Sequence, residues 1–434
     1  MSPLHIGFLG ILGLLLLIFV LRIPVGFALA ISGFLGFWAV LNLNAALGML
    51  GEETWDVLSS YGLTVIPLFV LMGQVCFHCG VNQRMYQAAQ AWMGQVKGGV
   101  AMATILACAG FAAICGSNTA TAATMSSVAL PEMKKYGYNR MFSSGVVASG
   151  STLGVMLPPS VVLIIIGLQT GQSIAVLFWA ALLPALLLAF LFLVSIWLFC
   201  SLRPDLAPAG EKYAWKQRLL SLRGVIEVLL LFGLVMGGLL LGVFTPSEAG
   251  AAGALLALLV GLAGGHLSWR RLVAACDDTL RISCMIMVII LGAVMFGRFL
   301  AVTRLPYEAA SFVADLALPP VMILTGVFLI YLLGGAIMDA LALLVITIPI
   351  FFPLAQSLGF DPVWFGVWVT LVTTMGAVTP PVGINTFIVA SMDPECNLQQ
   401  VFKGVGLFLP CFLLCAALLM LWPSLALWLP GFMQ

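Results

Sequence analysis

Oxygen-bearing side chains gather at two places where long apolar runs of this 434-residue chain are interrupted. The first reads CGSNTATAATMSS over 115–127 and offers Ser117 and Asn118, and the second reads GGAIMDA over 334–340 and offers Asp339. Oxygen ligands without thiolate or imidazole suit a hard cation, and so few full charges suit a monovalent one. An acidic residue between apolar arms is a functional-site hypothesis. The alternative is that these polar groups only face a water-filled vestibule.

Each polar stretch is followed by a double proline inside an apolar run, GVMLPPS over 154–160 and GAVTPPV over 376–382. A proline removes a backbone donor and clashes with the preceding turn, so two in succession predict about one unwound turn. Freed carbonyls in hydrocarbon cost several kcal/mol each unless they are satisfied, and a bound cation could satisfy them. Matching unwound segments in two halves of a chain indicate an ion and substrate site. The alternative is a pair of tolerated proline kinks.

The composition defines the surroundings of these motifs. The chain is 62% hydrophobic and only 8% charged, whereas soluble domains carry roughly 25% charged residues. Apolar stretches of the ~17 to 25 residues needed to cross a bilayer recur from one end to the other. We therefore expect an all-α polytopic membrane protein. The net charge of +1, with no basic run longer than two residues, gives no indication of a nucleic-acid partner.

Ten membrane crossings and two apolar hairpins are predicted. The hairpins lie near 99–133 and 318–356 and enter and return on the same side. The crossings lie near 5–21, 24–41, 61–81, 141–168, 173–200, 225–244, 248–264, 281–303, 362–390 and 404–424. With the N-terminus outside, all of the 17 Lys and Arg except Arg298 and Arg304 fall at the cytoplasmic face, as the positive-inside rule requires. An acidic loop with Glu52, Glu53 and Asp56 then lies outside, and so does the C-terminus.

An internal repeat relates the two double prolines. They lie 222 residues apart, and the same gapless offset pairs Ser117 with Asp339, Pro131 with Pro353, and Gly137 with Gly359. The most hydrophilic stretch, 203–224, separates the copies and reads as a cytoplasmic linker. We therefore divide the chain into a first repeat, 1–202, and a second repeat, 225–434. With five crossings each, the repeats must run in opposite directions, which is a hallmark of secondary transporters.

The motifs together resemble a known family. GSNTATAATMSSVALPEMKKYGY, SGSTLGVMLPPS, GAIMDALALLVITIPIFFP and GAVTPPVGINTF are similar to segments of the large membrane subunit of TRAP transporters, the tripartite ATP-independent periplasmic family within the ion-transporter superfamily. The resemblance covers essentially the whole chain. It implies a sodium-driven importer of an organic acid, such as a C4-dicarboxylate or sialic acid, in a bacterial inner membrane. It also implies an elevator mechanism, with a moving transport domain near 61–168 and 281–390 on a scaffold of the other spans.

The resemblance also implies partners. A periplasmic substrate-binding protein would deliver the organic acid, and a small membrane subunit of about four helices would pack against this chain in the lipid. We expect that subunit to be a separate chain, because no such region is fused here. The sequence does not name the acid, because the binding protein selects it. No cofactor is expected beyond Na⁺ as the coupling ion.

Individual site residues follow where the family resemblance and the residue chemistry meet. We expect two sodium sites, each combining a polar stretch with carbonyls of the adjacent unwound turn. The residues assigned to them are Gly116, Ser117, Asn118, Gly154 and Pro158 for the first, and Gly335, Asp339, Gly376, Thr379 and Pro380 for the second. Donors for a substrate carboxylate are Asn118, Thr119, Ser160, Asn385, Thr386 and backbone N–H groups. Arg298 is a carboxylate clamp, a snorkelling side chain or a structural partner of Asp339.

Three other functions are weighed against this one. A stand-alone sodium/carboxylate symporter of the same superfamily would share the hairpins but need no partners. A channel would not need two matched ion pockets. An intramembrane hydrolase needs a nucleophile and a base, yet the chain has no HExxH or GxSxG motif and its three histidines lie near span ends. We therefore do not expect an enzyme. The lone CxxC at 76–79 is a weak metal motif without a second pair.

Overall fold

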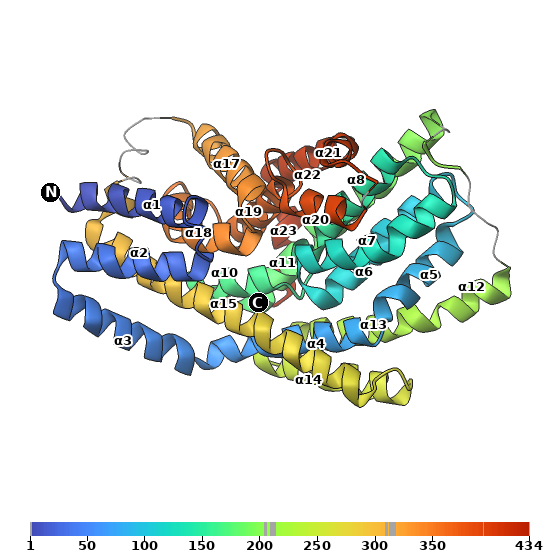
Figure 1. Cartoon of the computed structure of the whole chain (residues 1–434), viewed down its shortest axis with the longest axis horizontal. Coiled ribbons are helices and arrows are strands. Elements are labelled where there is room, and N and C mark those ends of the chain that lie inside the picture. The colour runs from blue at the N-terminus through green and yellow to red at the C-terminus, as the bar shows by residue number, and fades with distance from the viewer. Residues whose placement is uncertain are drawn as a thin grey trace.

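The computed structural model describes residues 2–203, 206–208, 214–308, 311, 318–393 and 395–433. Throughout this part the chain is helical, and no β-strand occurs in it (Figure 1). The expected all-α class is therefore confirmed. Part of the predicted linker, 203–224, lies outside the described residues, and its described part contains one short helix, α12 (Trp215–Ser221).

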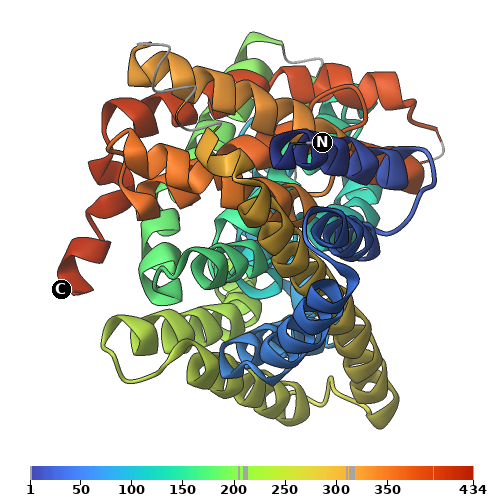
Figure 2. The ribbon, with the colours of Figure 1, turned by 90° about the vertical axis from the view of Figure 1, so that its left-hand side faces the viewer.

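Three helices form one end of the molecule: α1 (Pro3–Phe19), α2 (Val25–Val40) and α3 (Leu43–Ser59). Asn42 begins α3 as its N-cap, because its side-chain oxygen accepts a hydrogen bond from the Ala45 N–H at 2.8 Å. Figure 2 looks onto this end, where the long helix α15 lies beside the three. This end supplies one wall of the cavity described below.

A second group of helices continues from this end: the short 3₁₀ turn η1 (Tyr61–Thr64), α4 (Val65–His78), α5 (Val81–Met93), α13 (Arg223–Leu240), α14 (Pro246–Ala263) and α15 (Trp269–Thr303). Thr245 and Glu248 form a capping box at the start of α14, in which the Glu248 carboxylate accepts from the Thr245 N–H at 2.8 Å. The 35-residue α15 crosses the molecule obliquely and packs on both α2 and α4 (Figure 1).

Two helical hairpins correspond to the polar stretches of the sequence. The first consists of α6 (Gly99–Cys115) and α7 (Asn118–Lys135), and the second of α17 (Pro320–Ile337) and α18 (Ala340–Ser357). The bends are only two residues long, and in each case the second residue of the bend, Ser117 or Asp339, is the N-cap of the following helix. These polar residues therefore lie at the hairpin tips.

Both double prolines interrupt a helix. The first break, 157–160, separates α8 (Arg140–Ser151) and the single turn α9 (Leu153–Met156) from α10 (Val161–Thr170). The second break, 377–383, separates α19 (Pro362–Gly376) from α20 (Ile384–Met392). The Pro158–Pro159 and Pro380–Pro381 peptide bonds are both cis.

The 222-residue offset of the sequence recurs in the helix bounds. Helix α7 spans 118–135 and α18 spans 340–357, so both of their ends differ by 222 residues. The starts of α8 and α19, at 140 and 362, differ by the same number. Each half ends with further helices. The first half ends with α11 (Ile174–Leu202), and the second ends with α21 (Leu398–Gly406), α22 (Leu409–Leu421), α23 (Ser424–Leu427) and the 3₁₀ turn η3 (Pro430–Met433).

Eight helices of the described part are long and apolar enough to cross a membrane, or nine if the bent pair α21 and α22 is one span. The chain is therefore a multi-pass membrane protein. Three of the ten predicted crossings, 5–21, 24–41 and 362–390, correspond to shorter apolar helices, namely α1, α2 and the broken pair that begins with α19. The hairpin arms α17 and α18 are long and apolar enough instead. The number of crossings stays a prediction.

One detail of the predicted topology is wrong. The acidic segment with Glu52, Glu53 and Asp56 is not a loop but the last part of α3, an amphipathic helix too polar to resemble a span. The predicted span 281–303 lies within α15, which begins earlier, at Trp269, with a charged first part.

Candidate functional site

Both hairpin tips open into one cavity of about 890 Å³. Its walls are the tip segments 115–120 and 339–342, Val155, Val161 and Val162 around the first break, Ile384 at the second break, and parts of α2, α4 and α15. The segments that the sequence singled out for their chemistry, separated by more than 200 residues, therefore meet at one place. Most of the lining is apolar, with a few convergent polar groups, which is the usual composition of a small-molecule site.

Asn118 is the most unusual polar group at this cavity. Its side chain is only 4% exposed, and neither its Oδ1 nor its Nδ2 has a hydrogen-bond partner among the described residues. A buried carboxamide without partners costs stability, so such a group in a native fold calls for a ligand or another specific explanation. Asn118 is the first residue of α7, directly after the tip.

The first tip packs tightly against the first break. A Cβ added to Gly154 would lie 2.5 Å from the Ser117 carbonyl oxygen and 2.7 Å from the Thr121 hydroxyl oxygen, so this position has no room for a side chain. Gly116 has a φ of 63° and faces the Pro159 carbonyl, which a Cβ would approach to 2.7 Å. A left-handed φ is accessible to glycine at little cost. Carbonyl oxygens of the tip and the break therefore gather beside Asn118.

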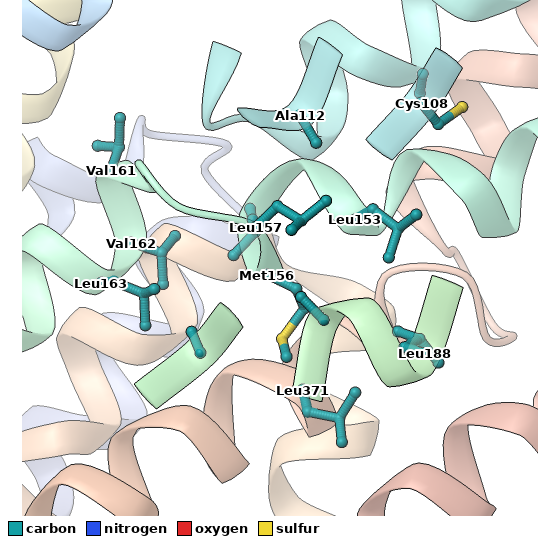
Figure 3. Packing of buried hydrophobic residues seen from close by; sticks show 14 of the residues in the cluster. Cys108, Ala112, Leu153, Met156, Leu157, Val161, Val162, Leu163, Leu188 and Leu371 are labelled. Atoms are coloured by element: carbon teal, nitrogen blue, oxygen red, sulfur yellow. The ribbon is translucent and has the colours of Figure 1, made fainter. Parts of the chain in front are cut away.

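Apolar side chains surround the first break. Leu153 and Met156 of the α9 turn, and Leu157 directly after it, lie among residues of α6, α11 and α19, as Figure 3 shows with Cys108, Leu188 and Leu371. Pro158, Pro159 and Ser160 are buried as well. The Ser160 hydroxyl begins α10 as its N-cap, where it accepts from the Leu163 N–H at 3.5 Å, and Ser160 is not among the cavity-lining residues.

The second tip is bonded directly to the second break. The N–H groups of Val382 and Gly383 both donate to the Ala336 carbonyl, at 3.2 and 2.8 Å. The backbones of Gly335 and Gly376 are in direct contact. A Cβ added to Gly376 would lie 2.8 Å from the Gly335 Cα. Of the predicted residues of this site, Gly335 and Gly376 are thus in direct contact, and hydrogen bonds join the segments that carry them.

Asp339 and Thr379 supply side-chain oxygens on the second side. Asp339 lines the cavity and caps α18, where its Oδ2 accepts from the Leu341 N–H at 3.1 Å. The Thr379 hydroxyl donates to the Met375 carbonyl at 2.7 Å, which leaves its lone pairs free to bind an ion. Pro380 and Pro381 are exposed, in contrast with the buried prolines of the first break.

Helix ends and one carboxylate set the charge around the cavity. The first residues of α2, α7, α10, α18 and α20 all lie in its lining. Each helix N-terminus carries roughly half a positive charge, which favours an anion nearby. Among the described lining residues there is no Lys, Arg or His, and Asp339 is the only carboxylate.

Other predicted substrate residues lie elsewhere. Thr119 lines the cavity, whereas Asn385 and Thr386 are fully buried outside its lining. The Thr386 hydroxyl donates to the Gly383 carbonyl at 2.5 Å. Arg298 is also outside the lining, and its Nε donates to Glu53 of α3 at 2.5 Å. The ion-pair partner of Arg298 is therefore Glu53 and not Asp339, the partner considered from the sequence, because α3 brings Glu53 beside α15.

Parts of the cavity wall were not expected from the sequence. Gln74 of α4 lies in the lining, together with residues 24–27 of α2 and residues between 282 and 289 of α15. Gln74 is a single polar residue in the apolar run VIPLFVLMGQVCF, and that isolation was a usable signal. The α2 and α15 segments are apolar, so nothing in their composition distinguishes them from lipid-facing helix.

Comparisons with known proteins agree with this architecture. A family model described as "Tripartite ATP-independent periplasmic transporter, DctM component" matches residues 12–425. A "C4-dicarboxylate TRAP transporter large permease protein DctM" of Pseudomonas aeruginosa is 34% identical over 348 residues, which cover 79% of this chain and 80% of that protein. A "Sialic acid TRAP transporter large permease protein SiaM" of Vibrio cholerae is 28% identical, with 94% of both chains covered.

A solved structure is similar in fold. The crystal structure of the Alcanivorax borkumensis YdaH transporter superposes with a TM-score of 0.61 at 14% sequence identity, and the match covers 89% of this chain and 90% of that one. At this identity the likeness concerns the arrangement of the helices, not the substrate.

Proposed function

This chain belongs to the DctM family of tripartite ATP-independent periplasmic transporters, and from that premise we propose that it is a sodium-driven secondary importer of an organic acid. Membership makes it a transport permease and not an enzyme. The observation that carries the proposal is the convergence of two hairpin tips and two helix breaks on one cavity that bears an unpartnered buried carboxamide.

The first sodium site that we propose lies between the first tip and the first break. Asn118 Oδ1 would be a ligand, together with the Ser117 hydroxyl and carbonyl oxygens near Gly154 and Pro158. Support comes from the two unpartnered Asn118 atoms and from the close approach of Gly154 to the Ser117 carbonyl. A neutral oxygen cage suits a monovalent hard cation in surroundings that exclude water.

The second sodium site would use Asp339 or the neighbouring backbone of Gly335, with carbonyl oxygens from Gly376 to Pro380 and the Thr379 hydroxyl. It is supported by the bonds that tie the second break to the Ala336 carbonyl, because they hold the two ligand-bearing segments together. Here the carboxylate lies in the wall of the cavity.

The substrate would lie in the cavity with its anionic group toward the helix N-termini. The described lining has no cationic side chain, so the N–H groups of α7 and α18 and the side chains of Asn118 and Thr119 would bind the carboxylate. Gln74 is a further donor within reach of the cavity. The relatives named for C4-dicarboxylate and sialic acid transport support an organic acid as the class of substrate.

We further propose that the two halves are inverted repeats and that transport follows an elevator mechanism. The matching helix bounds at the 222-residue offset support the repeat. The hairpins and broken helices would move together as the transport domain, near 61–168 and 281–390, against the remaining helices. Inverted repeats with discontinuous helices at the binding site are a common architecture of secondary transporters.

The proposed setting is a bacterial inner membrane with both termini on the periplasmic side. The word "tripartite" in the family description supports two further components, which we propose to be a periplasmic substrate-binding protein and a small membrane subunit of about four helices. The binding protein would select the organic acid before it reaches the cavity.

Uptake into liposomes tests this function. The chain, reconstituted with its small subunit and loaded binding protein, should take up substrate only when sodium is present, and each net positive charge carried inward should gain about 2.3 kcal/mol per 100 mV. Uptake that is equally fast with choline replacing sodium would refute sodium coupling. Equal uptake of free substrate without the binding protein would instead indicate a stand-alone symporter, and currents too large for a carrier would indicate a channel.

A further inference from the structure

Asn385 lies outside the cavity lining but connects the two halves of the site. It is fully buried, and its Nδ2 donates a hydrogen bond of 3.0 Å to the hydroxyl oxygen of Ser151, 234 residues away. Its own N–H donates to the Ala377 carbonyl at 3.0 Å, which closes the second break. One residue thus bonds to both broken helices.

Each end of this link leads to one of the proposed ion pockets. Ser151 is the last residue of α8, three residues before Gly154, whose backbone lies against the Ser117 carbonyl of the first tip. On the other side, Ala377 begins the break that is bonded through Gly383 to the Ala336 carbonyl of the second tip. A continuous chain of bonds and close contacts therefore joins the first tip to the second.

The link is specific to one direction of the repeat. The counterpart of Asn385 at the 222-residue offset is Leu163, a fully buried leucine that cannot bond to the second half. The counterpart of Ser151 is Thr373, whose hydroxyl donates to the Val369 carbonyl of its own helix at 2.7 Å. The bond between the two broken helices is therefore made from the second half to the first only.

One hydrogen-bond acceptor of Asn385 is not used. Its Oδ1 is buried and has no partner among the described residues. A carboxamide held by only one of its two ends can rotate or shift when either neighbouring segment moves, whereas a fully bonded one is fixed. The two breaks are the segments that would rearrange on binding an ion, so both would act on this side chain.

We propose that Asn385 is a positioning residue that couples the two proposed cation pockets, so that an ion in one pocket raises the affinity of the other. This inference rests on the proposed sodium coupling. Binding at the first pocket would fix the end of α8, and Ser151 would then hold Asn385 and the second break in their binding geometry. By linkage the effect is reciprocal, and couplings of this kind typically change affinity about 5- to 150-fold.

Sodium-dependent thermal stabilisation of the full-length chain in detergent tests the coupling, with choline keeping the ionic strength constant. For two coupled pockets the Hill coefficient of the wild type should lie well above 1, its limit being about 2. Asn385→Leu, which installs the residue of the other half, should lower it to about 1 and raise the half-saturating sodium about fivefold. Ser151→Ala, a smaller change, should do the same.

Two comparisons make the test decisive. The double variant should be no worse than either single one, because both remove the same bond. Thr373→Val removes the matched hydroxyl of the other half and should leave the Hill coefficient unchanged. If sodium stabilises every variant with the Hill coefficient of the wild type, or if that coefficient is already 1, the coupling is refuted while sodium binding stands. If sodium does not stabilise the wild type at all, the proposed function fails as well.

Discussion

The two hairpin-and-break units, 99–170 and 320–392, share a backbone but differ in chemistry and in exposure. The break at 157–160 is buried, whereas Pro380, Pro381 and Val382 are exposed. At the tip of the buried unit, Asn118 provides a neutral carboxamide, and its counterpart in the exposed unit is Ala340. The exposed unit instead provides the carboxylate of Asp339. Burying a charge costs far more than burying an amide. An amide ligand therefore costs less in the buried unit than a carboxylate would at the same place.

Substitutions at the close contact between tip and break should produce the largest changes in Tm, and the two units should differ in the size of that change. Gly154→Ala and Gly376→Ala each place a Cβ about as close as 2.5 or 2.6 Å to a backbone oxygen, and overpacking of this kind costs roughly 1–3 kcal/mol. Both glycines are buried, but the break after Gly154 is buried too, whereas the break after Gly376 is exposed at Pro380 to Val382 and can shift more easily. We therefore expect a larger drop in Tm for Gly154→Ala, and loss of sodium stabilisation at the affected pocket in both variants. Thermal unfolding in detergent, with and without sodium, measures both.

Gly297→Ala is the control for these two variants. Gly297 is within α15, and a Cβ there would meet nothing within 4 Å. It should be neutral or slightly stabilising, since alanine loses less backbone entropy than glycine on forming a helix. Equal Tm losses for Gly154→Ala and Gly376→Ala would show that the difference in burial between the units has no energetic consequence.

The buried ligand should be worth more to ion binding than the exposed one. Asn118→Ala should raise the half-saturating sodium about tenfold, equivalent to about 1.4 kcal/mol of lost ion affinity. Its stability without sodium should not fall, because removal of a buried polar group that has no partners can be neutral or favourable. Sodium titration of Tm checks both statements. A lower Tm without sodium, together with an unchanged sodium response, would mean that Asn118 serves the fold only.

The sequence determined the tips and the breaks well, because their signals are local. Gly116 ends the first arm of the first hairpin, and Ser117 and Asp339 cap the next helix of each hairpin with their own side chains. Double prolines cannot continue a helix whatever surrounds them. The repeat offset followed from the same local motifs, which is why the helix bounds reproduce it.

Features that depend on distant contacts could not be predicted in this way. Helix α3 is too polar to resemble a span, and only its packing on α15 and the Arg298–Glu53 pair reveal its role. That pair joins residues 245 positions apart, and no local pattern indicates it. The apolar cavity walls from α2 and α15, and the position of Asn385 behind the cavity rather than in it, likewise follow from how helices pack.

The exposed carboxylate should have a smaller effect than Asn118. Asp339→Asn keeps an N-cap of similar quality for α18, so stability should change by less than about 0.5 kcal/mol. The loss of charge should raise the half-saturating sodium about threefold, because the carbonyl oxygens and the Thr379 hydroxyl of the proposed site remain as ligands. Asp339→Ala also removes the cap and should cost about 1 kcal/mol more. An effect of Asp339→Asn larger than that of Asn118→Ala would reverse the proposed ranking of the two ligands.

The smallest effect should come from the exposed ion pairs that join the first unit to the loop directly after the second unit. Glu395, in the loop between α20 and α21, accepts from Lys134 Nζ at 2.9 Å and also pairs with Arg140. The bond from Lys134 and the charge of Arg140 lower the pKa of Glu395. A carboxyl whose pKa is lower in the folded state contributes stability above its unfolded pKa, and this contribution is lost as the pH falls through the folded value.

Glu395→Gln should therefore lower Tm only slightly at neutral pH, and the difference from the wild type should shrink as the pH falls through the acidic range and as salt is added, since exposed pairs are weak and screened. Tm measured across pH and ionic strength checks this. Lys135→Gln is the control, because it removes a neighbouring exposed lysine that is 4.0 Å from Glu132. In this background, Glu395→Gln should lower Tm by the same amount, with the same dependence on pH and salt. A Glu395→Gln difference that grows toward acidic pH would have the wrong sign for a carboxylate held by two cations, and the two units would then be joined at this surface by packing alone.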